Sequence, residues 1–362
     1  MKRKFSKSKI IFFFLITILL ILIGGNLFLL LSRTEQPNIE IPYINQIDST
    51  QEVFLLSKLK SMTIDEKRGL LFMVSIPDKV LSKTTIKFLK ENYIGGVVLL
   101  GNNVETETQI KQLTKDLREK VNENLLIAID QEGGTVVRIP WDKYSNLSAR
   151  DIGLTNDNNF AYEVARYRAE LLLDLGINVI LGPVADIAYT KNSFMYDRSF
   201  GSDPETVAKF VEAFVKGQND AGIITVLKHF PGHGRTTTDS HKDFPVIHLS
   251  KEELLAGEFI PFKRGIEAGA EMIMLAHIVN PLIDPDIPAS VSFEYVEILE
   301  RELGFFRIVI TDDLDMTGKI DTEIGWGINL VAEKFESIKS RIEDTNPDDN
   351  YVIKVLQLVY PR

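Results

Sequence analysis

The chain has 362 residues, 44% of them hydrophobic and 25% charged, with a formal net charge of −10 and no cysteine. This composition excludes disordered and collagen-like chains, and the lack of cysteine excludes disulfides, thiolate metal sites, iron–sulfur clusters and cysteine nucleophiles. Six of the 41 basic residues lie in the first 34 positions, where no acidic residue occurs, so the rest of the chain is strongly acidic and we expect no nucleic-acid partner.

The N-terminus contains a candidate membrane anchor. Five basic residues precede position 10, and the 22 residues 10–31 carry no charge. A helix of that length would be roughly 33 Å long, enough to cross the apolar core of a bilayer. The run ends in LFLLL rather than in small residues, which favours an uncleaved anchor over a cleaved signal peptide. The charge asymmetry predicts that residues 1–9 are cytoplasmic and that the chain beyond the anchor is extracellular.

A short linker follows the predicted transmembrane segment. Residues 32–50 mix Pro, Asn and acidic residues without periodicity, which is typical of a spacer. The remaining stretch, residues 51–362, has the length of an ordinary (β/α)8 barrel. The sequence therefore predicts a basic segment, an anchor, a linker and one folded domain.

Strands and helices alternate through this domain. Seven short apolar runs rich in β-branched residues predict strands at 70–76, 94–100, 125–129, 179–184, 223–227, 272–276 and 308–311. Stretches with helical spacing lie between them, among them 106–121, 160–175, 204–221, 251–268 and 293–303. This alternation predicts a parallel sheet with right-handed crossovers, and hence an α/β fold of the (β/α)8 TIM-barrel type.

The pattern leaves the eighth strand undecided, because only 46 residues follow Met316. Residues 329–342 have the apolar spacing of a helix, residues 346–350 are typical of a turn, and residues 351–360 fit either a strand or a helix. Without an eighth strand, the first and seventh strands would have unpaired edges.

Polar residues follow five of the seven predicted strands. They are Asp130, Asp186, the Lys228–His229 pair, His277 and the Asp312–Asp313 pair. Active sites of such barrels lie at the carboxyl ends of the strands. We therefore expect an active site at this end of the domain.

Four of the five histidines, at positions 229, 233, 241 and 248, are close in sequence, which suggests proton transfer or metal binding. His229, His233, Asp239 and His241 could supply four metal ligands. A Pro–Gly pair between the first two histidines breaks helical i, i+4 spacing, and no known ligand motif remains. We therefore expect no metal ion and no cofactor, and we expect His233 and His248 to be hydrogen-bonded within a polar loop.

Several motifs together resemble one enzyme family. KHFPGHG at 228–234, DSH at 239–241 and TDDLDM at 311–316 are similar to segments of β-N-acetylhexosaminidases of glycoside hydrolase family 3. DQEGG at 130–134, GPVADI at 182–187 and DRSFGSDP at 197–204 extend the resemblance, which covers about residues 73–316. It implies that residues 51–362 form a single catalytic barrel that removes terminal N-acetylglucosamine with retention of configuration, commonly from peptidoglycan fragments.

The resemblance also implies roles for individual residues. Retention requires a carboxylate that forms a glycosyl-enzyme and an acid that protonates the leaving oxygen. The resemblance assigns the nucleophile to Asp312 and the acid/base to His241, with Asp239 orienting the imidazole and balancing the charge of its cation. It assigns sugar binding to Asp130, Arg138, Arg198, Lys228 and His229.

Two other functions stay open. The chain lacks the Ala/Gly-rich helix that usually precedes the last strand in this family, so a catalytically impaired, saccharide-binding relative is one alternative. An N-acetylglucosaminide phosphorylase is another, because a neutral histidine repels an incoming phosphate less than a carboxylate would. In every case the expected partners are an N-acetylglucosamine-containing saccharide and, through the N-terminal helix, the cell membrane.

Overall fold

The computed structural model describes residues 49–237, 245–315, 325–331 and 335–360. The part of the chain from Ile47 to Arg362 makes up one compact unit. The predicted anchor at 10–31 lies outside the described residues. Within them, no helix combines the length and the apolar character that a bilayer crossing needs.

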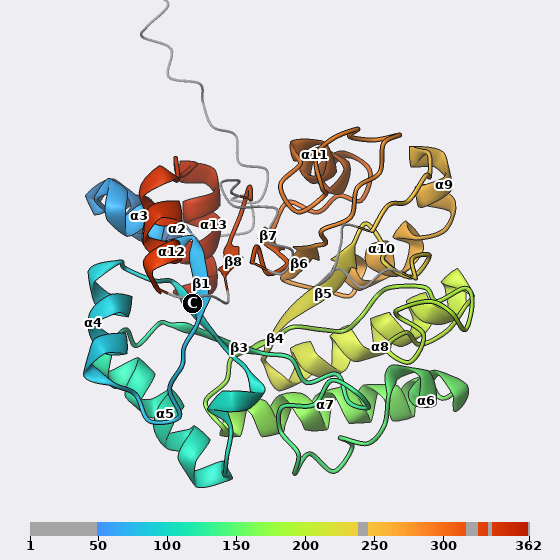
Figure 1. Cartoon of the computed structure of the whole chain (residues 1–362), viewed down its shortest axis with the longest axis horizontal. Coiled ribbons are helices and arrows are strands. Elements are labelled where there is room, and N and C mark those ends of the chain that lie inside the picture. The colour runs from blue at the N-terminus through green and yellow to red at the C-terminus, as the bar shows by residue number, and fades with distance from the viewer. Residues whose placement is uncertain (1–48, 238–244, 316–324, 332–334, 361–362) are drawn as a thin grey trace, which may run out of the picture. The chain divides into compact units, whose positions relative to one another are not determined.

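Eight parallel strands form the sheet, in the order β7-β6-β5-β4-β3-β2-β1-β8 (Figure 1). They are β1 (Phe72–Ser75), β2 (Gly96–Leu99), β3 (Leu126–Ile129), β4 (Val179–Ile180), β5 (Ile224–Phe230), β6 (Met272–Leu275), β7 (Ile308–Thr311) and β8 (Asn329–Val331). Each of the seven predicted strands overlaps one of β1–β7. The predicted α/β architecture is therefore confirmed.

The eighth strand brings the sheet close to a closed barrel. Leu330 of β8 is in register with Met73 of β1. On the other side, Ile328 forms a parallel bridge with Ile310 of β7. Gly327 permits this approach, because a Cβ atom there would lie 2.0 Å from the carbonyl oxygen of Val309. The barrel is thus nearly closed, and both β1 and β7 have a neighbour on their outer sides.

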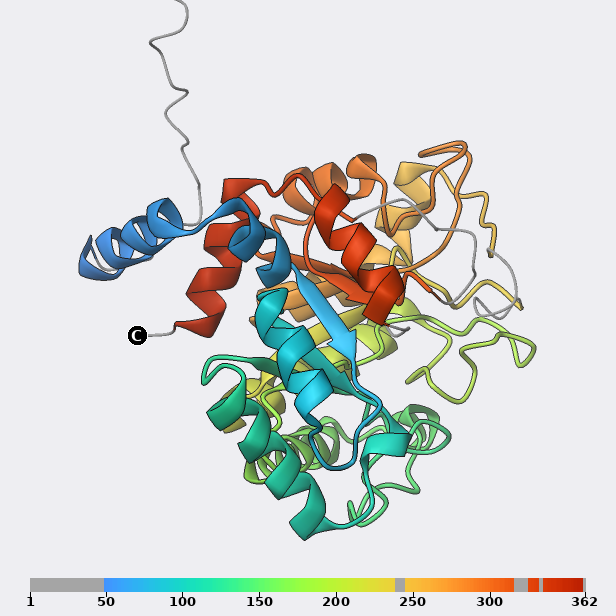
Figure 2. The same ribbon diagram turned by 60° about the vertical axis from the view of Figure 1, so that its left-hand side comes forward.

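Helices surround the strands, and Figure 2 shows α4 alongside β1. The described helices are α2 (Ser49–Ser61), α3 (Ile64–Leu70), α4 (Lys83–Glu91), η2 (Gly101–Asn103), α5 (Glu107–Lys120), α6 (Ala149–Leu154), α7 (Asn158–Asp174), α8 (Pro204–Ala221), α9 (Lys251–Ala256), α10 (Phe259–Glu267), α11 (Phe293–Arg301), α12 (Phe335–Asp344) and α13 (Asp349–Val359). The first and last of them pack together, with α13 against α2 and α12 against α3.

The unit α8–β5 shows how local sequence positions the site. Asp203 caps α8 by accepting a hydrogen bond from the Thr206 backbone, and Pro204 occupies the first turn, where its missing N–H costs nothing. The helix ends at Gly222, whose φ of 90° favours glycine over other residues. The chain then enters β5, which carries Lys228 and His229 near its carboxyl end.

Two predicted helices differ from the structure. The helix predicted at 329–342 is wrong in its first residues, because Asn329 pairs through its backbone with Leu71 at 2.8 Å and begins β8. This long-range pairing overrides the local helical spacing. The helix predicted at 251–268 is two helices, because Gly257 takes a non-helical conformation between α9 and α10. The undecided segment 351–360 is helical over most of its length, in α13.

Candidate active site

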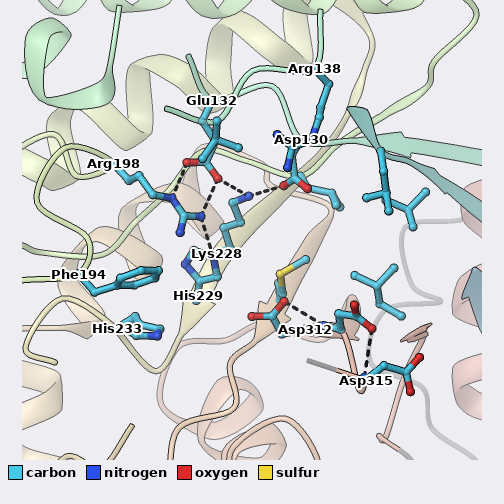
Figure 3. A pocket seen from close by; sticks show the side chains of 17 residues that line it. Asp130, Glu132, Arg138, Phe194, Arg198, Lys228, His229, His233, Asp312 and Asp315 are labelled. Atoms are coloured by element: carbon cyan, nitrogen blue, oxygen red, sulfur yellow. Dashed lines mark hydrogen bonds and ion pairs between the residues drawn. The ribbon is translucent and has the colours of Figure 1, made fainter. Parts of the chain in front are cut away.

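A cavity of about 360 Å³ lies at the carboxyl ends of the strands. All of the predicted site residues that the structure describes line it, namely Asp130, Arg138, Arg198, Lys228, His229 and Asp312. Figure 3 shows how strands and loops far apart in sequence bring these side chains together. The predicted acid/base residue His241 and its partner Asp239 lie outside the described residues.

A buried carboxylate, Glu132, connects the cations of the cavity. Its Oε1 lies 2.6 Å from Lys228 Nζ and 2.8 Å from Arg198 Nη2, while its Oε2 accepts from Arg198 Nε at 2.8 Å. The pair with Arg198 is bidentate, the geometry in which a guanidinium binds a carboxylate most strongly. Lys228 Nζ also lies 2.6 Å from Asp130 Oδ1. Glu132 therefore fixes two side chains that the sequence assigned to sugar binding.

The charges in this network reinforce one another. Burial alone would raise the pKa of Glu132, but Lys228 and Arg198 hold it well below its usual value. Burial alone would lower the pKa values of Arg198 and Lys228, but Glu132 and Asp130 raise them above their usual values. Glu132, Arg198 and Lys228 are therefore charged at neutral pH, and the cavity presents a fixed network of charges to a polar ligand.

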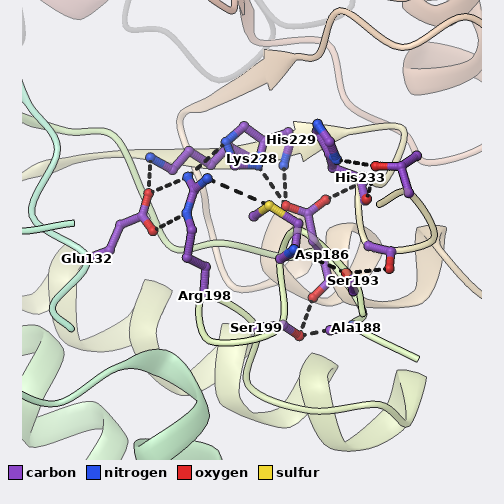
Figure 4. A network of polar contacts seen from close by, with 12 residues as sticks. Glu132, Asp186, Ala188, Ser193, Arg198, Ser199, Lys228, His229 and His233 are labelled. Carbon is purple, nitrogen blue, oxygen red and sulfur yellow. Dashed lines mark hydrogen bonds and ion pairs between the residues drawn. The ribbon is translucent and has the colours of Figure 1, made fainter. Parts of the chain in front are cut away.

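A second network orients the histidines (Figure 4). Asp186, fully buried at the end of the GPVADI segment, lies 2.7 Å from His229 Nδ1 through Oδ2 and accepts from the backbone N–H of His233 at 2.6 Å through Oδ1. Burial would raise the pKa of Asp186, but the adjacent His229 and His233 lower it. Arg198 Nη2 lies 3.3 Å from the other imidazole nitrogen of His229, which links the two networks.

Asp312 follows β7 directly and is partly exposed to the cavity. Its backbone N–H donates to the carbonyl oxygen of Leu275 at 2.8 Å, and its Oδ1 accepts from the backbone N–H of Asp313 at 2.9 Å. Burial would raise the pKa of Asp312, but His277, His229 and the Asp313 N–H lower it below its usual value. The carboxylate is therefore ionised at neutral pH, as a nucleophile must be.

His277 supports the Asp312 segment from β6. Its Nε2 lies 2.7 Å from the carbonyl oxygen of Asp313, and its Nδ1 lies 2.8 Å from Ser290 Oγ. A carbonyl oxygen only accepts a hydrogen bond, so Nε2 of His277 carries a proton and donates it to Asp313. The imidazole thus holds the turn after β7 in place.

Sequence reasoning missed three residues of the site. Glu132 stands two positions after Asp130, and in an extended segment that spacing places both side chains on one face, a signal that could have found it. Asp186 was recognised as a strand-end residue but received no role. His233, which was expected to be bonded within a loop, is hydrogen-bonded at Nδ1 to Thr236 and also lines the cavity.

The described residues do not form a metal site. Among the described residues, no group of three or more His, Asp or Glu side chains is placed to hold a metal ion. Two of the four ligands considered from the sequence, Asp239 and His241, lie outside those residues.

Comparison with known proteins identifies the family. The model of the "Glycosyl hydrolase family 3 N terminal domain" matches residues 63–329. A β-hexosaminidase of Xylella fastidiosa strain M23 is 36% identical over 254 residues, which cover 68% of this chain and 75% of the relative. A β-hexosaminidase of Xanthomonas euvesicatoria pv. vesicatoria is 31% identical over 299 residues, covering 76% of this chain and 89% of the relative.

Solved structures agree with this result. A family 3 β-N-acetylglucosaminidase from Paenibacillus sp. FPU-7 is similar with a TM-score of 0.76 and 30% identity, covering 82% of this chain and 62% of that protein. NagZ from Neisseria gonorrhoeae is similar with a TM-score of 0.70 and 28% identity, covering 80% of this chain and 88% of that protein. The barrel, the cavity at its strand ends and these matches together show that the chain belongs to glycoside hydrolase family 3, as a glycoside hydrolase of the β-N-acetylhexosaminidase type.

Proposed function

We propose that the protein removes terminal β-linked N-acetylglucosamine from peptidoglycan-type saccharides, with retention of configuration. The observation that carries this proposal is the ionised Asp312 at the end of β7, which lines one cavity with Lys228, His229 and Arg198. A carboxylate that faces a set of sugar-binding side chains is the arrangement that a retaining glycosidase requires. The similarity to β-hexosaminidases and to a β-N-acetylglucosaminidase supports the choice of sugar.

The charged side chains around Glu132 bind the sugar in this proposal. Asp130 gives one oxygen to Lys228, so its second oxygen can accept from a sugar hydroxyl. Lys228 and Arg198 are held by Glu132 and can donate to hydroxyl oxygens from fixed positions. Arg138 lines the same cavity and adds a further cation at its rim. Fixed donors and acceptors suit a rigid ligand with many hydroxyl groups.

The chemical step uses two residues. The Asp312 carboxylate attacks the anomeric carbon and forms a glycosyl ester, while the leaving oxygen takes a proton from His241. Water then attacks the anomeric carbon of this ester, gives a proton to His241 and displaces the Asp312 carboxylate. Asp239 supplies the negative charge that stabilises the cationic imidazole. The similarity of the DSH segment to the family motif supports the roles of His241 and Asp239.

The location proposed for the enzyme follows from its N-terminus. The 22 uncharged residues at 10–31, preceded by five basic residues, support a membrane anchor with the barrel outside the cell. An anchored extracellular barrel would meet cell-wall saccharides directly. This location agrees with a peptidoglycan-type substrate.

Hydrolysis of a chromogenic β-N-acetylglucosaminide by the purified full chain tests the proposal, with the anomeric form of the first product read by proton NMR. We expect turnover and a β product. Saccharide binding without turnover would indicate the impaired relative, and an α product would contradict retention. The same assay in the presence of phosphate separates hydrolysis from phosphorolysis, because a phosphorylase would release a sugar 1-phosphate.

A further inference from the structure

At the wall of the cavity, His233 has a buried nitrogen that finds no partner among the described residues. The residue is 1% exposed and lines the cavity beside Phe194 (Figure 3). Its Nε2 makes no hydrogen bond within the described part of the chain. A buried polar atom that lacks a partner costs free energy, so native proteins seldom keep one without a reason. A ligand in the cavity could supply the missing partner.

The hydroxyl of Thr236 determines what kind of partner His233 needs. Thr236 Oγ1 donates to the carbonyl oxygen of His233 at 3.0 Å and lies 2.7 Å from His233 Nδ1. A hydroxyl has one proton, so both contacts are satisfied only if Nδ1 carries a proton and donates to Oγ1. In the neutral imidazole Nε2 is then bare and accepts a hydrogen bond. Burial lowers the pKa of His233 and so favours the neutral form.

Neighbouring segments hold the imidazole in this position. The backbone N–H of His233 donates to Asp186 at 2.6 Å, and the His233 and Phe194 rings lie 5.4 Å apart between centroids. Phe194 in turn donates from its backbone to the carbonyl oxygen of Thr236 at 3.0 Å. The acceptor nitrogen is therefore fixed before any ligand arrives, which is the condition for specific recognition.

We propose that His233 is a further substrate-contacting residue, whose Nε2 accepts a hydrogen bond from a hydroxyl or the amide N–H of the bound N-acetylhexosamine. This inference rests on the proposed function, because it takes the ligand of the cavity to be that sugar. Thr236 acts as a positioning residue that sets the tautomer of His233. Lys228 and Arg198 offer donors only, so His233 complements them with an acceptor.

Two variants and a matched control test the residue itself. His233→Phe keeps an aromatic ring against Phe194 and removes the acceptor, and Thr236→Val removes the acceptor of Nδ1. Titration calorimetry with N-acetylglucosamine should show that each change weakens binding about tenfold, the effect of one hydrogen bond. Thr236→Ser keeps the hydroxyl and should bind as tightly as the wild type. Unchanged affinity in both His233→Phe and Thr236→Val would overturn the proposal.

Nitrogen NMR distinguishes recognition from a structural role. In the wild type the ¹⁵N shifts of His233 should show a protonated Nδ1 and a bare Nε2, and the Nε2 shift should move when N-acetylglucosamine binds. Thr236→Val should change the tautomer, whereas Thr236→Ser should not. These signals decide the question even if His233→Phe fails to fold. The proposal would be overturned if Nε2 were protonated in the wild type, or if its ¹⁵N shift did not change on addition of N-acetylglucosamine.

Sugar analogues identify the donor. The 3-, 4- and 6-deoxy forms of N-acetylglucosamine and 2-deoxyglucose each lack one candidate donor. One of these analogues should bind the wild type about tenfold more weakly than N-acetylglucosamine does. For that analogue alone, the His233→Phe variant should bind as strongly as the wild type, because the hydrogen bond is already lost. Equal losses for all the sugars would overturn the role of His233 and leave the proposed function intact. Failure of the wild type to bind any of them would overturn the proposed function and the inference with it.

Discussion

Replacing Glu132 with Gln removes one negative charge from between two buried cations and nearly preserves the volume of the side chain. The Glu132 side chain is 6% exposed, that of Lys228 is 2% exposed and that of Arg198 is 18% exposed. Lys228 would keep Asp130 as a partner, whereas the described part of the chain gives Arg198 no second carboxylate at ion-pair distance. The variant therefore leaves a largely buried guanidinium without its counter-charge.

The ion-pair distances of Glu132 determine how much stability the substitution removes. At an effective dielectric constant of about 20, two unit charges ~2.7 Å apart attract by about 6 kcal/mol before desolvation is counted. Desolvation offsets much of this attraction, and removing one partner of a buried pair costs about 3–5 kcal/mol in practice. We expect Glu132→Gln to lower the free energy of unfolding by that amount. An exposed glutamate gives the control, because Glu119→Gln should change it by less than about 0.5 kcal/mol.

Urea unfolding of both variants over a range of pH checks this prediction. Because the folded-state pKa of Glu132 is depressed, its stabilising effect is fully present above its unfolded value of about 4.3 and is lost as the pH falls below it. The difference between wild type and Glu132→Gln should therefore be constant from about pH 8 to pH 5 and should shrink below about pH 4. A difference below about 1 kcal/mol at neutral pH, or one that grows on acidification, would refute the reasoning.

Three further predictions concern catalysis and topology. Asp312→Ala should lower turnover by several orders of magnitude while sugar binding persists, because the covalent step disappears, and an active Asp312→Ala beside an inactive Asp313→Ala would move the role by one residue. His241→Ala should slow the hydrolysis of aryl N-acetylglucosaminides with poor leaving groups far more than that of activated ones, and Asp239→Asn should have the same effect in milder form. A uniform loss of rate across the series would contradict acid catalysis by His241. If residues 10–31 anchor the chain, washed membranes should retain it and external protease should digest the barrel, whereas a soluble form starting near residue 34 would indicate cleavage.

Much of the fold could be predicted from sequence, because each of β1–β7 is a short apolar run and each of β2–β6 is followed by a stretch with clear helical spacing. The strand β8 has only three residues, too few to show a period. Its identity depends on pairing with β1, a contact between residues more than 250 positions apart. Local patterns carry no information on such a pairing.

The site was predictable where a polar residue ends a strand, as at Asp130, Lys228 and Asp312. The site was harder to predict where a buried residue contributes only by positioning other side chains. Glu132 and Asp186 work by holding Arg198 and His229, and a carboxylate that is buried in an ion pair looks, in sequence, like any carboxylate in a polar turn. Their roles depend on distances that only the folded chain defines.

The proposed mechanism requires Asp312 to form a covalent glycosyl-enzyme. Rapid quenching of the wild type during turnover of a slow fluorinated N-acetylglucosaminide, followed by peptide mass spectrometry, tests it most directly. We expect the peptide containing Asp312 to gain the mass of one fluorinated N-acetylglucosaminyl group, and Asp312→Ala to show no such gain. Label on another carboxylate, or turnover with an inverted product and no label, would contradict the claim.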